Sequence, residues 1–504
     1  METGMASDDV RPITRRTLLK GGLIVAATSL ALPAIGAASA SEDKRREPSP
    51  TTPPGTVMAT LAMYMKEAQT RALPADAAEH TKLHVLDTLA AMVSGSELAP
   101  GRAALAYVQS SGSRATATVA CSKTLAGPIE AALANAMMAH ADETDDSHAP
   151  SQSHPGCSIV PAALAAGEHF DNDGARFLRS VALGYDIGTR MNMTLGAHGF
   201  EVGNHQSSHA FAGIWGSTAA AGCAASLSVQ QLPWLLAYAA DQSSGLTVWQ
   251  RDTDHIQKAF AFAGVGARNG VSAAMMVHSG WTGVDDVFSG QYNFFNAYAP
   301  NADPSQLIDK LGERYEVIRT NIKKWSVGSP IQAPLDALTI MRAKHPFDAN
   351  QVQRVVVRVA TSEGNLVDNR EMPDISMQHM IAVMLLDKTA SFKSAHDKPR
   401  MQNAEILRQR AKVTMVRDEA LEKLLPSRVA IVEVTLNDGT TLTERVDAVR
   451  GTAQNPMTHE EIVAKARDLM TPVLGATSTT RLIDKVVSME AVKRLRELRP
   501  LLQG

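Results

Sequence analysis

Apolar residues recur at three- and four-residue spacing through much of this chain, from Val57 to Leu311. This spacing places the apolar side chains on one face of an α-helix, and no other feature of the sequence constrains the fold as strongly. One run ends at Gly95, a residue type that often follows the last turn of a helix. Its apolar positions are Leu83, Leu86, Leu89, Ala90 and Val93. The pattern predicts a large all-helical domain over residues 57–318.

One segment of this region, residues 217–226, consists of small side chains (Ser-Thr-Ala-Ala-Ala-Gly-Cys-Ala-Ala-Ser). Small residues let two helices approach closely in a buried bundle. The composition agrees, because 44% of the 504 residues are hydrophobic but only 5% are aromatic, so Ala, Leu, Val and Met must fill the core. A chain of this length is expected to form one large domain and a smaller one.

From about residue 321, β-branched residues alternate with polar ones. Asn437-Asp438-Gly439 is a strong hairpin-turn signal between two such segments, and a helix is expected from Met377 to Leu386. Three valines are expected on one face of a strand: Val355, Val357 and Val359. The pattern predicts a smaller α+β domain over residues 319–455.

The last segment, residues 456–504, is expected to be helical. Pro456 precedes the capping box Thr458-x-x-Glu461, which predicts where a helix begins. We expect these C-terminal helices to pack back on the helical domain. The fold class is therefore expected to be mainly α.

The first forty residues have the features of an export signal. Arg15 and Arg16 belong to a twin-arginine pattern, an apolar run follows from Gly21 to Leu32, and Ala38-Ser39-Ala40 is a typical cleavage site. A basic N-terminal helix or an uncleaved anchor is the alternative, but the run is short for a bilayer span. We expect a twin-arginine signal peptide over residues 1–40, a disordered linker over 41–56, and a periplasmic protein without stable membrane insertion after cleavage.

Charge and cysteine content exclude several classes of protein. The formal net charge is -3 with both signs spread along the chain, so no basic field favours a nucleic-acid partner. Cys121, Cys157 and Cys223 form neither a disulfide framework nor a paired metal-binding pattern. Packing alone is expected to hold the fold.

The densest group of ionisable residues follows a predicted apolar helix that ends near Met138. It contains His140, Asp142, Glu143, Asp145, Asp146, His148 and His154. Burying so many ionisable groups is costly, so we expect them to line a cleft at the helix end. Aspartate and histidine together either ligate a divalent metal or move protons. The alternative without function is a solvated loop that caps helices.

Two further segments carry residues of interest. His205 and His209 lie one helical turn apart, but Gln206 stands where zinc proteases have glutamate, so polar residues at a helix start are the simpler interpretation. Lys258 lies among small apolar residues, where it would suit a substrate carboxylate, although lysines more commonly face solvent. The glycines from Gly264 to Gly270 lack the strand and the Gly-Lys-Ser/Thr ending of a nucleotide loop.

Taken in order, these segments resemble the MmgE/PrpD family along nearly the whole chain after the linker. The matching blocks are His84 to Gly95, Asp145-Asp146 with His154-Pro155, Gly184-Tyr185-Asp186 with Arg190, Ala239 to Leu246, Lys258 with Gly264 to Gly270, Lys324-Trp325, Leu335-Asp336-Ala337 and Ser376-Met377-Gln378. The resemblance implies a helical domain, an α+β lid with a pocket between them, a homodimer, and neither metal nor organic cofactor. Known members dehydrate 2-methylcitrate, decarboxylate cis-aconitate or epimerise iminodisuccinate.

By position, the resemblance also implies roles for individual residues. His154 corresponds to the pocket histidine that moves the proton, and Asp145 and Asp146 correspond to residues that orient it. Lys258, Lys324 and His209 correspond to groups that bind substrate carboxylates. Glu143, Asp146 and Ser147 are also expected to contact substrate. Two of these positions carry a different residue type from the family: Glu143, where aspartate is frequent, and Ser147, where threonine is frequent.

In the lid, two substrate-facing positions differ from the family. Gln332 replaces a histidine and His379 replaces a tyrosine. Glutamine cannot titrate and histidine can, so this pair indicates a changed substrate, altered proton delivery or lost activity. His379 is a candidate second acid.

The sequence thus predicts a cofactor-free lyase that acts on a small di- or tricarboxylate. An epimerase or isomerase of the same family is one alternative. The other is a periplasmic polycarboxylate-binding protein without catalysis.

Overall fold

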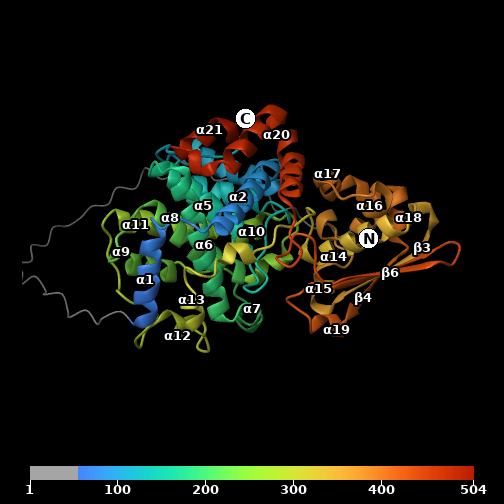
Figure 1. Ribbon diagram of the computed structural model, residues 1–504, viewed down its shortest axis with the longest axis horizontal. Helices are drawn as coiled ribbons and strands as arrows, with labels where there is room; N and C mark the ends of the chain where they lie inside the picture. Colours follow the sequence, from blue (N-terminus) through green and yellow to red (C-terminus); the bar gives the residue numbers. More distant parts are fainter. Residues whose placement is uncertain (1–54) are drawn as a thin grey trace, which may run out of the picture. The chain divides into compact units, whose positions relative to one another are not determined.

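A computed structural model describes residues 55–504 of the chain (Figure 1). The expected signal peptide and nearly all of the linker lie outside these residues and stay predictions. None of the helices described is both long and apolar enough to cross a membrane. The described chain is mainly helical, as predicted, and its buried hydrophobic residues form two large clusters, which we call the first core and the second core.

The first core contains buried side chains from Met58 to Ile322 and again from Ile462 to Leu502. Its first thirteen helices are α1 (Thr56–Ala68), α2 (Ala75–Gly95), α3 (Ala99–Ser110), α4 (Pro128–Ala139), α5 (Gly156–His169), α6 (Gly174–Leu195), α7 (His198–Asn204), α8 (Ser208–Ala224), α9 (Gln231–Asp241), α10 (Ile256–Ala259), α11 (Val265–His278), α12 (Phe294–Tyr298) and α13 (Ser305–Ile308). One detail differs from the all-helical prediction, since β1 (Ala117–Thr118) pairs antiparallel with β2 (Leu125–Ala126). A π-helical turn, η2 (Phe260–Gly264), joins α10 to α11.

Helices α6, α8 and α11 pack unusually closely because glycines face one another. A Cβ built on Gly188 of α6 would lie 2.4 Å from the carbonyl oxygen of Ala212 in α8. One built on Gly266 of α11 would lie 2.7 Å from the carbonyl carbon of Gly213. Most of the predicted small-residue segment, residues 217–226, lies in the same buried helix α8, where a Cβ built on Gly270 of α11 would lie 2.5 Å from the carbonyl carbon of Ser217.

The second core contains buried side chains from Trp325 to Val449. Its elements are α14 (Ser329–Lys344), β3 (Val352–Ala360), α15 (Thr361–Val367), α16 (Met377–Asp387), α17 (Phe392–His396), α18 (Ala404–Arg410), β4 (Val413–Asp418), α19 (Glu419–Glu422), β5 (Ala430–Leu436) and β6 (Thr441–Val446). The sheet order is β4-β3-β5-β6, with β3 and β4 parallel and the other pairs antiparallel. Helices α14 and α16 pack against this sheet.

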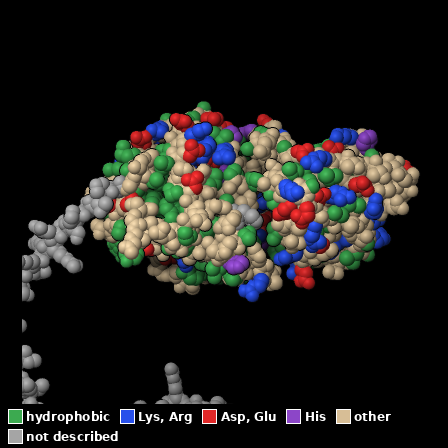
Figure 2. All heavy atoms as spheres, turned by 90° about the horizontal axis from the view of Figure 1, so that it is seen from below, with side chains coloured by type: hydrophobic (Ala, Val, Ile, Leu, Met, Phe, Trp, Pro, Cys, Tyr) green, Lys and Arg blue, Asp and Glu red, His purple; other side chains and the backbone are tan. Residues whose placement is uncertain are grey.

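Three local predictions for this region are confirmed. The valines of β3 at positions 355, 357 and 359 are all buried on one face. The Asn437-Asp438-Gly439 turn joins β5 to β6. Helix α16 begins and ends within one residue of the predicted helix. Acidic and basic side chains are interspersed on the face drawn in Figure 2. Ion pairs of the second core include Lys344–Glu444 and Arg354–Glu433.

The chain returns to the first core through α20 (His459–Val487) and α21 (Arg499–Leu502). The capping box forms as predicted, because the Thr458 and Glu461 side chains each accept a hydrogen bond from the other residue's backbone N–H. Short 3-10 helices occur at η1 (Thr247–Arg251), η3 (Glu316–Arg319), η4 (Ala349–Gln351), η5 (Pro373–Ile375), η6 (Pro399–Gln402), η7 (Met489–Ala491) and η8 (Leu495–Leu498).

Candidate active site

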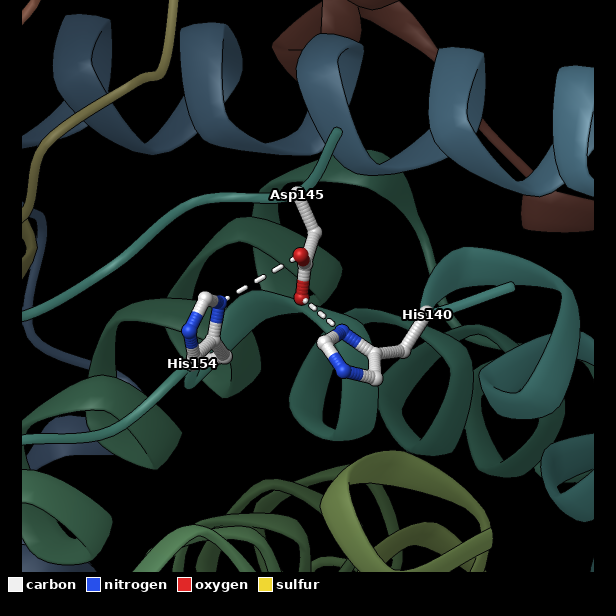
Figure 3. A group of neighbouring side chains, drawn as sticks. All are labelled: His140, Asp145 and His154. Carbon is white, nitrogen blue, oxygen red and sulfur yellow. Dashed lines mark hydrogen bonds and ion pairs between the residues drawn. The ribbon is translucent and has the colours of Figure 1, made fainter. Parts of the chain in front are cut away.

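The loop between α4 and α5, residues 140–155, is buried and carries the predicted ionisable cluster; we call it the acidic loop. Asp145 lies between two histidines (Figure 3). Its Oδ2 accepts a hydrogen bond of 2.9 Å from Nδ1 of His140, and its Oδ1 lies 3.3 Å from Nδ1 of His154. Asp145 is fully buried and His154 is 8% exposed, which excludes the solvated-loop alternative.

Two lysine ammonium groups neutralise the carboxylates of this loop. Lys258 of α10 forms an ion pair with Glu143. The Nζ of Lys323 lies 3.7 Å from a carboxylate oxygen of Glu143 and 3.7 Å from one of Asp145, and it donates a 2.9 Å hydrogen bond to the Glu143 carbonyl oxygen. Lys323 is itself buried. The cluster therefore brings two cations and two anions together, and only Lys258 keeps part of its side chain, 16%, exposed.

Backbone pairing near Ser147 brings Lys323 to the acidic loop. The N–H of Ser147 donates to the carbonyl oxygen of Asn321 at 2.9 Å, and the N–H of Asn321 donates back at 2.8 Å. Lys323 is two residues beyond this bridge. Ser147 thus acts through its backbone, whereas the sequence suggested that it contacts substrate.

The structure corrects the choice of lysine in this segment. Lys324 is half-buried, and its ammonium lies over the Trp325 ring, 4.6 Å from the ring centroid, rather than among the acidic-loop residues. The buried neighbour, Lys323, takes the position expected for Lys324. Sequence reasoning missed it because two adjacent lysines carry the same chemistry, and only burial distinguishes them.

The π-helical turn presents an aromatic ring to the histidines. Phe262 stacks with His209 at 3.7 Å and with His140 at 4.5 Å between ring centroids. The His154 ring lies 5.1 Å from that of His209. His209, at the start of α8, thus joins the cluster as predicted from its position, and π-helical turns are frequent at functional sites.

His255 is a further member that the sequence did not indicate. Its ring lies 5.3 Å from that of His140, and its backbone is left-handed with a φ of 68°. Burial, followed by the charge of Lys258, lowers the pKa of His255 to about 3. No motif surrounds it, so nothing in the sequence could have found it.

The electrostatics keep the carboxylates ionised and the reactive histidines neutral. Burial alone would raise the pKa of Glu143, but Lys258 and Lys323 hold it well below the ordinary value. Burial and then Lys323 lower the pKa of His154, although Asp145 opposes them. Burial and the neighbouring His154 hold the pKa of His209 well below its usual range. A neutral imidazole beside two ammonium groups can accept a proton from a bound acid.

Asp146 anchors the acidic loop to neighbouring helices through hydrogen bonds. Its Oδ2 accepts hydrogen bonds from Nδ1 of His84 at 2.8 Å and from the Tyr185 hydroxyl at 2.5 Å, and its Oδ1 accepts one from the N–H of Gly156 at 3.0 Å. All its contacts run to α2, α5 and α6. Asp146 therefore positions the loop and does not line the cluster.

Gln332 and His379, which were predicted to face substrate from the lid, are not part of the acidic-loop cluster. The Gln332 side chain bonds the N–H and the carbonyl oxygen of Trp325, at 3.1 and 2.7 Å, and the carbonyl oxygen of Val327 at 2.9 Å, so it holds a backbone turn. His379 is fully buried in α16, and within the described residues neither ring nitrogen has a hydrogen-bond partner. Burial lowers the pKa of His379 to about 4, and the charged groups that influence it belong to the second core. Neither residue joins the acidic-loop cluster.

Two residues of the second core reach the acidic loop instead. Nε2 of His396, the last residue of α17, lies 2.9 Å from Oδ2 of Asp142. Asp374 of η5 is buried close enough to His396, Glu143 and Asp142 for their charges to influence it. Sequence reasoning did not single out either residue.

Several side chains of the acidic-loop cluster lie close enough together to resemble a metal site. Two sets of side chains, one of His140, Asp145 and His154 and one of His140, Glu143 and His255, have donor atoms within 4.8 Å of one another. The carboxylates in both sets, however, lie within 3.7 Å of the Lys323 ammonium. A divalent cation would be repelled strongly there, because burial weakens screening. The donor set suits anion binding and proton transfer better.

Comparison with known domains covers both cores. The MmgE/PrpD N-terminal domain matches residues 59–307, and the MmgE/PrpD C-terminal domain matches residues 325–490. The chain belongs to the MmgE/PrpD family. The resemblance inferred from ordered sequence blocks is thereby confirmed.

Several relatives of this MmgE/PrpD chain are decarboxylases by name. The cis-aconitate decarboxylase-like protein oryM of Aspergillus oryzae is 24% identical over 90% of this chain and 98% of the relative. The cis-aconitate decarboxylases of Aspergillus terreus and Homo sapiens are 24% and 26% identical, over 89% and 84% of this chain and 95% and 90% of those proteins. The MmgE/PrpD domains and these relatives together support a lyase.

Proposed function

We propose that this protein is a cofactor-free lyase that acts on a small di- or tricarboxylate, by decarboxylation or by dehydration. One observation carries the proposal: the ammonium groups of Lys258, which is largely buried, and Lys323, which is almost fully buried, lie in the same cluster as the neutral imidazole of His154. Buried ammonium groups bind carboxylates strongly, and a nearby imidazole can move a proton. The names of the relatives make cis-aconitate the first substrate to test.

In this mechanism, each lysine binds one substrate carboxylate and loosens its contact with Glu143 or Asp145. For dehydration, His154 removes a proton from carbon, the electron pair forms the double bond as the C–O bond breaks, and the departing hydroxyl takes that proton back from His154 and leaves as water. For decarboxylation, the C–C bond breaks, carbon dioxide leaves, and protonated His154 returns a proton to the carbanion. Asp145 holds the His154 ring in place and stabilises its protonated form.

The arrangement of the two cores completes the proposal. The second core, within residues 319–455, serves as a lid on the helical domain of residues 57–318, and residues 456–504 extend that helical domain. The lid contributes His396 and Asp374 to the wall of the site. We further propose a periplasmic homodimer, exported through the twin-arginine signal in residues 1–40.

The adjacent lysines offer a matched test. We expect Lys323→Ala to lower kcat/KM at least about a hundredfold, because a buried charge-assisted contact is worth about 3 kcal/mol. Lys324→Ala, which removes the same charge one residue away, should stay within about threefold of the unaltered protein. The measurement is a screen of di- and tricarboxylates by ultraviolet absorbance of unsaturated product and by carbon dioxide release. Tight binding of an acid by calorimetry without conversion would instead identify a binding protein.

A further inference from the structure

His396 forms the one direct ion pair between α17 of the second core and the acidic loop among the residues that the structure describes. Its Nδ1 lies 2.7 Å from the carbonyl oxygen of Phe392, one helical turn earlier. A carbonyl oxygen can only accept, so Nδ1 carries a proton. Its Nε2 lies 2.9 Å from an Asp142 carboxylate oxygen, the distance of an ion pair when the ring is protonated. Protons on both ring nitrogens match the two oxygen atoms that face them.

Asp142 is fixed on the side of the acidic loop. Its carboxylate accepts hydrogen bonds from the N–H of Thr144 at 2.9 Å and from the Thr144 hydroxyl at 2.6 Å. The next residue is Glu143, whose carboxylate pairs with Lys258. A group that holds Asp142 therefore also fixes the start of the segment that positions Glu143 and Asp145.

The charges around His396 favour its protonated form. Asp142 faces it from the acidic loop and Asp374 from η5, while Lys258 and Glu143 are close enough to Asp374 for their charges to influence that carboxylate. At the other end of α17, the N–H of Phe392 donates to Asp468 of α20 at 3.4 Å. Burial alone would lower the pKa of His396, but Asp142 and then Asp374 raise it to about 9.

We propose that His396 is a positioning residue: its ring clasps Asp142 and holds the second core on the acidic loop, so that substrate is enclosed between them. Its kinetic consequence rests on the proposed function, whereas the clasp itself does not. Because the folded-state pKa is raised, the clasp is complete below about pH 6.5 and is lost as pH rises through about 9. The clasp predicts a closed site at neutral pH and an open one in alkali.

Hydrogen exchange of the purified full chain, read by mass spectrometry and corrected for intrinsic rates, tests the clasp without any substrate. Peptides that cover residues 140–155 and α17 should be protected at pH 7 and exchange at least about tenfold faster at pH 10. His396→Gln should exchange fast at both values. His396→Lys, which keeps its charge to higher pH, should stay protected at pH 10. His345→Gln, an exposed histidine of the second core, is the control and should behave as the unaltered protein.

Turnover provides the second readout. His396→Gln should raise KM about tenfold with a smaller change in kcat, and His396→Lys should restore KM and extend activity to higher pH. The clasp would be overturned if His396→Gln were as well protected from exchange as the unaltered protein. It would also be overturned if His396→Lys lost its protection at the same pH as the unaltered protein. If no acid is converted by the unaltered protein, the proposed lyase fails while the exchange experiment still decides the clasp.

Discussion

At the scale of single residues, burial decides what each ionisable group does. Lys323 and Lys324 are identical in chemistry, yet only the buried one neutralises Glu143 and Asp145. The resemblance placed His209 in the same pocket as His154, and their two rings lie 5.1 Å apart. His255 was not predicted, since its relevance comes from contacts with residues more than a hundred positions away in the sequence.

His255 should make the fold sensitive to acid. Its pKa is lowered to about 3 in the folded state, so between about pH 6.5 and pH 3 the unfolded chain binds a proton that the folded chain does not. The free energy of unfolding should therefore decrease as the pH is lowered. This residue alone should account for roughly 3 kcal/mol of the decrease between pH 6.5 and 4. His255→Asn should lessen that fall in urea titrations, since asparagine tolerates the left-handed backbone found there.

His345→Asn, on the exposed surface, is the control for this experiment. An acid response in His255→Asn as steep as that of the unaltered protein would show that His255 accepts a proton in the folded state.

At the scale of elements, local patterns predicted most helices and strands. The capping box of α20, the β5–β6 hairpin and the small-residue helix α8 all follow from short-range chemistry. The π-helical turn at Phe260–Gly264 and the β1–β2 pair were not predicted. Both depend on packing around them, which periodicity in the sequence does not reveal.

The glycine contacts between α8 and α11 should be intolerant of a methyl group. Gly266→Ala would place a Cβ 2.7 Å from the Gly213 backbone, so we expect a loss of about 1–3 kcal/mol in the free energy of unfolding. Gly203→Ala is the control, since no atom lies within 4 Å of its Cβ position and alanine favours a helix. Urea denaturation measures both, and equal stabilities would show that the two helices can move apart freely.

At the scale of the whole molecule, the C-terminal helix links distant parts of the chain. Lys465 of α20 lies 2.6 Å from an oxygen of Asp87 in α2 and donates a 2.9 Å hydrogen bond to the carbonyl oxygen of Thr144 in the acidic loop. The Lys465 side chain and Asp87 are both nearly fully buried. Helix α20 therefore supports the candidate site from more than three hundred positions away in the sequence.

Removing this lysine should be costly because it leaves a buried carboxylate unpaired. We expect Lys465→Met to lower the free energy of unfolding by about 3 kcal/mol or more, and a further Asp87→Asn change to recover part of the loss. Lys485→Met breaks the exposed pair with Glu497 and should cost less than about 1 kcal/mol. Thermal and urea unfolding of the four proteins give the comparison, and equal effects of the two single lysine changes would contradict it.

The sequence by itself determined the family, the mainly helical class, many helix and strand positions, and the acidic loop with His154 and Lys258. These features follow from periodicity, turn chemistry and ordered blocks, all of which act over short stretches of chain. Only the tertiary structure decided that Lys323 lies in the acidic-loop cluster, that Gln332 and His379 do not join it, and that His396 and Asp374 reach the acidic loop. Those outcomes depend on which side chains lose water together, and burial between distant segments is a property of the folded chain.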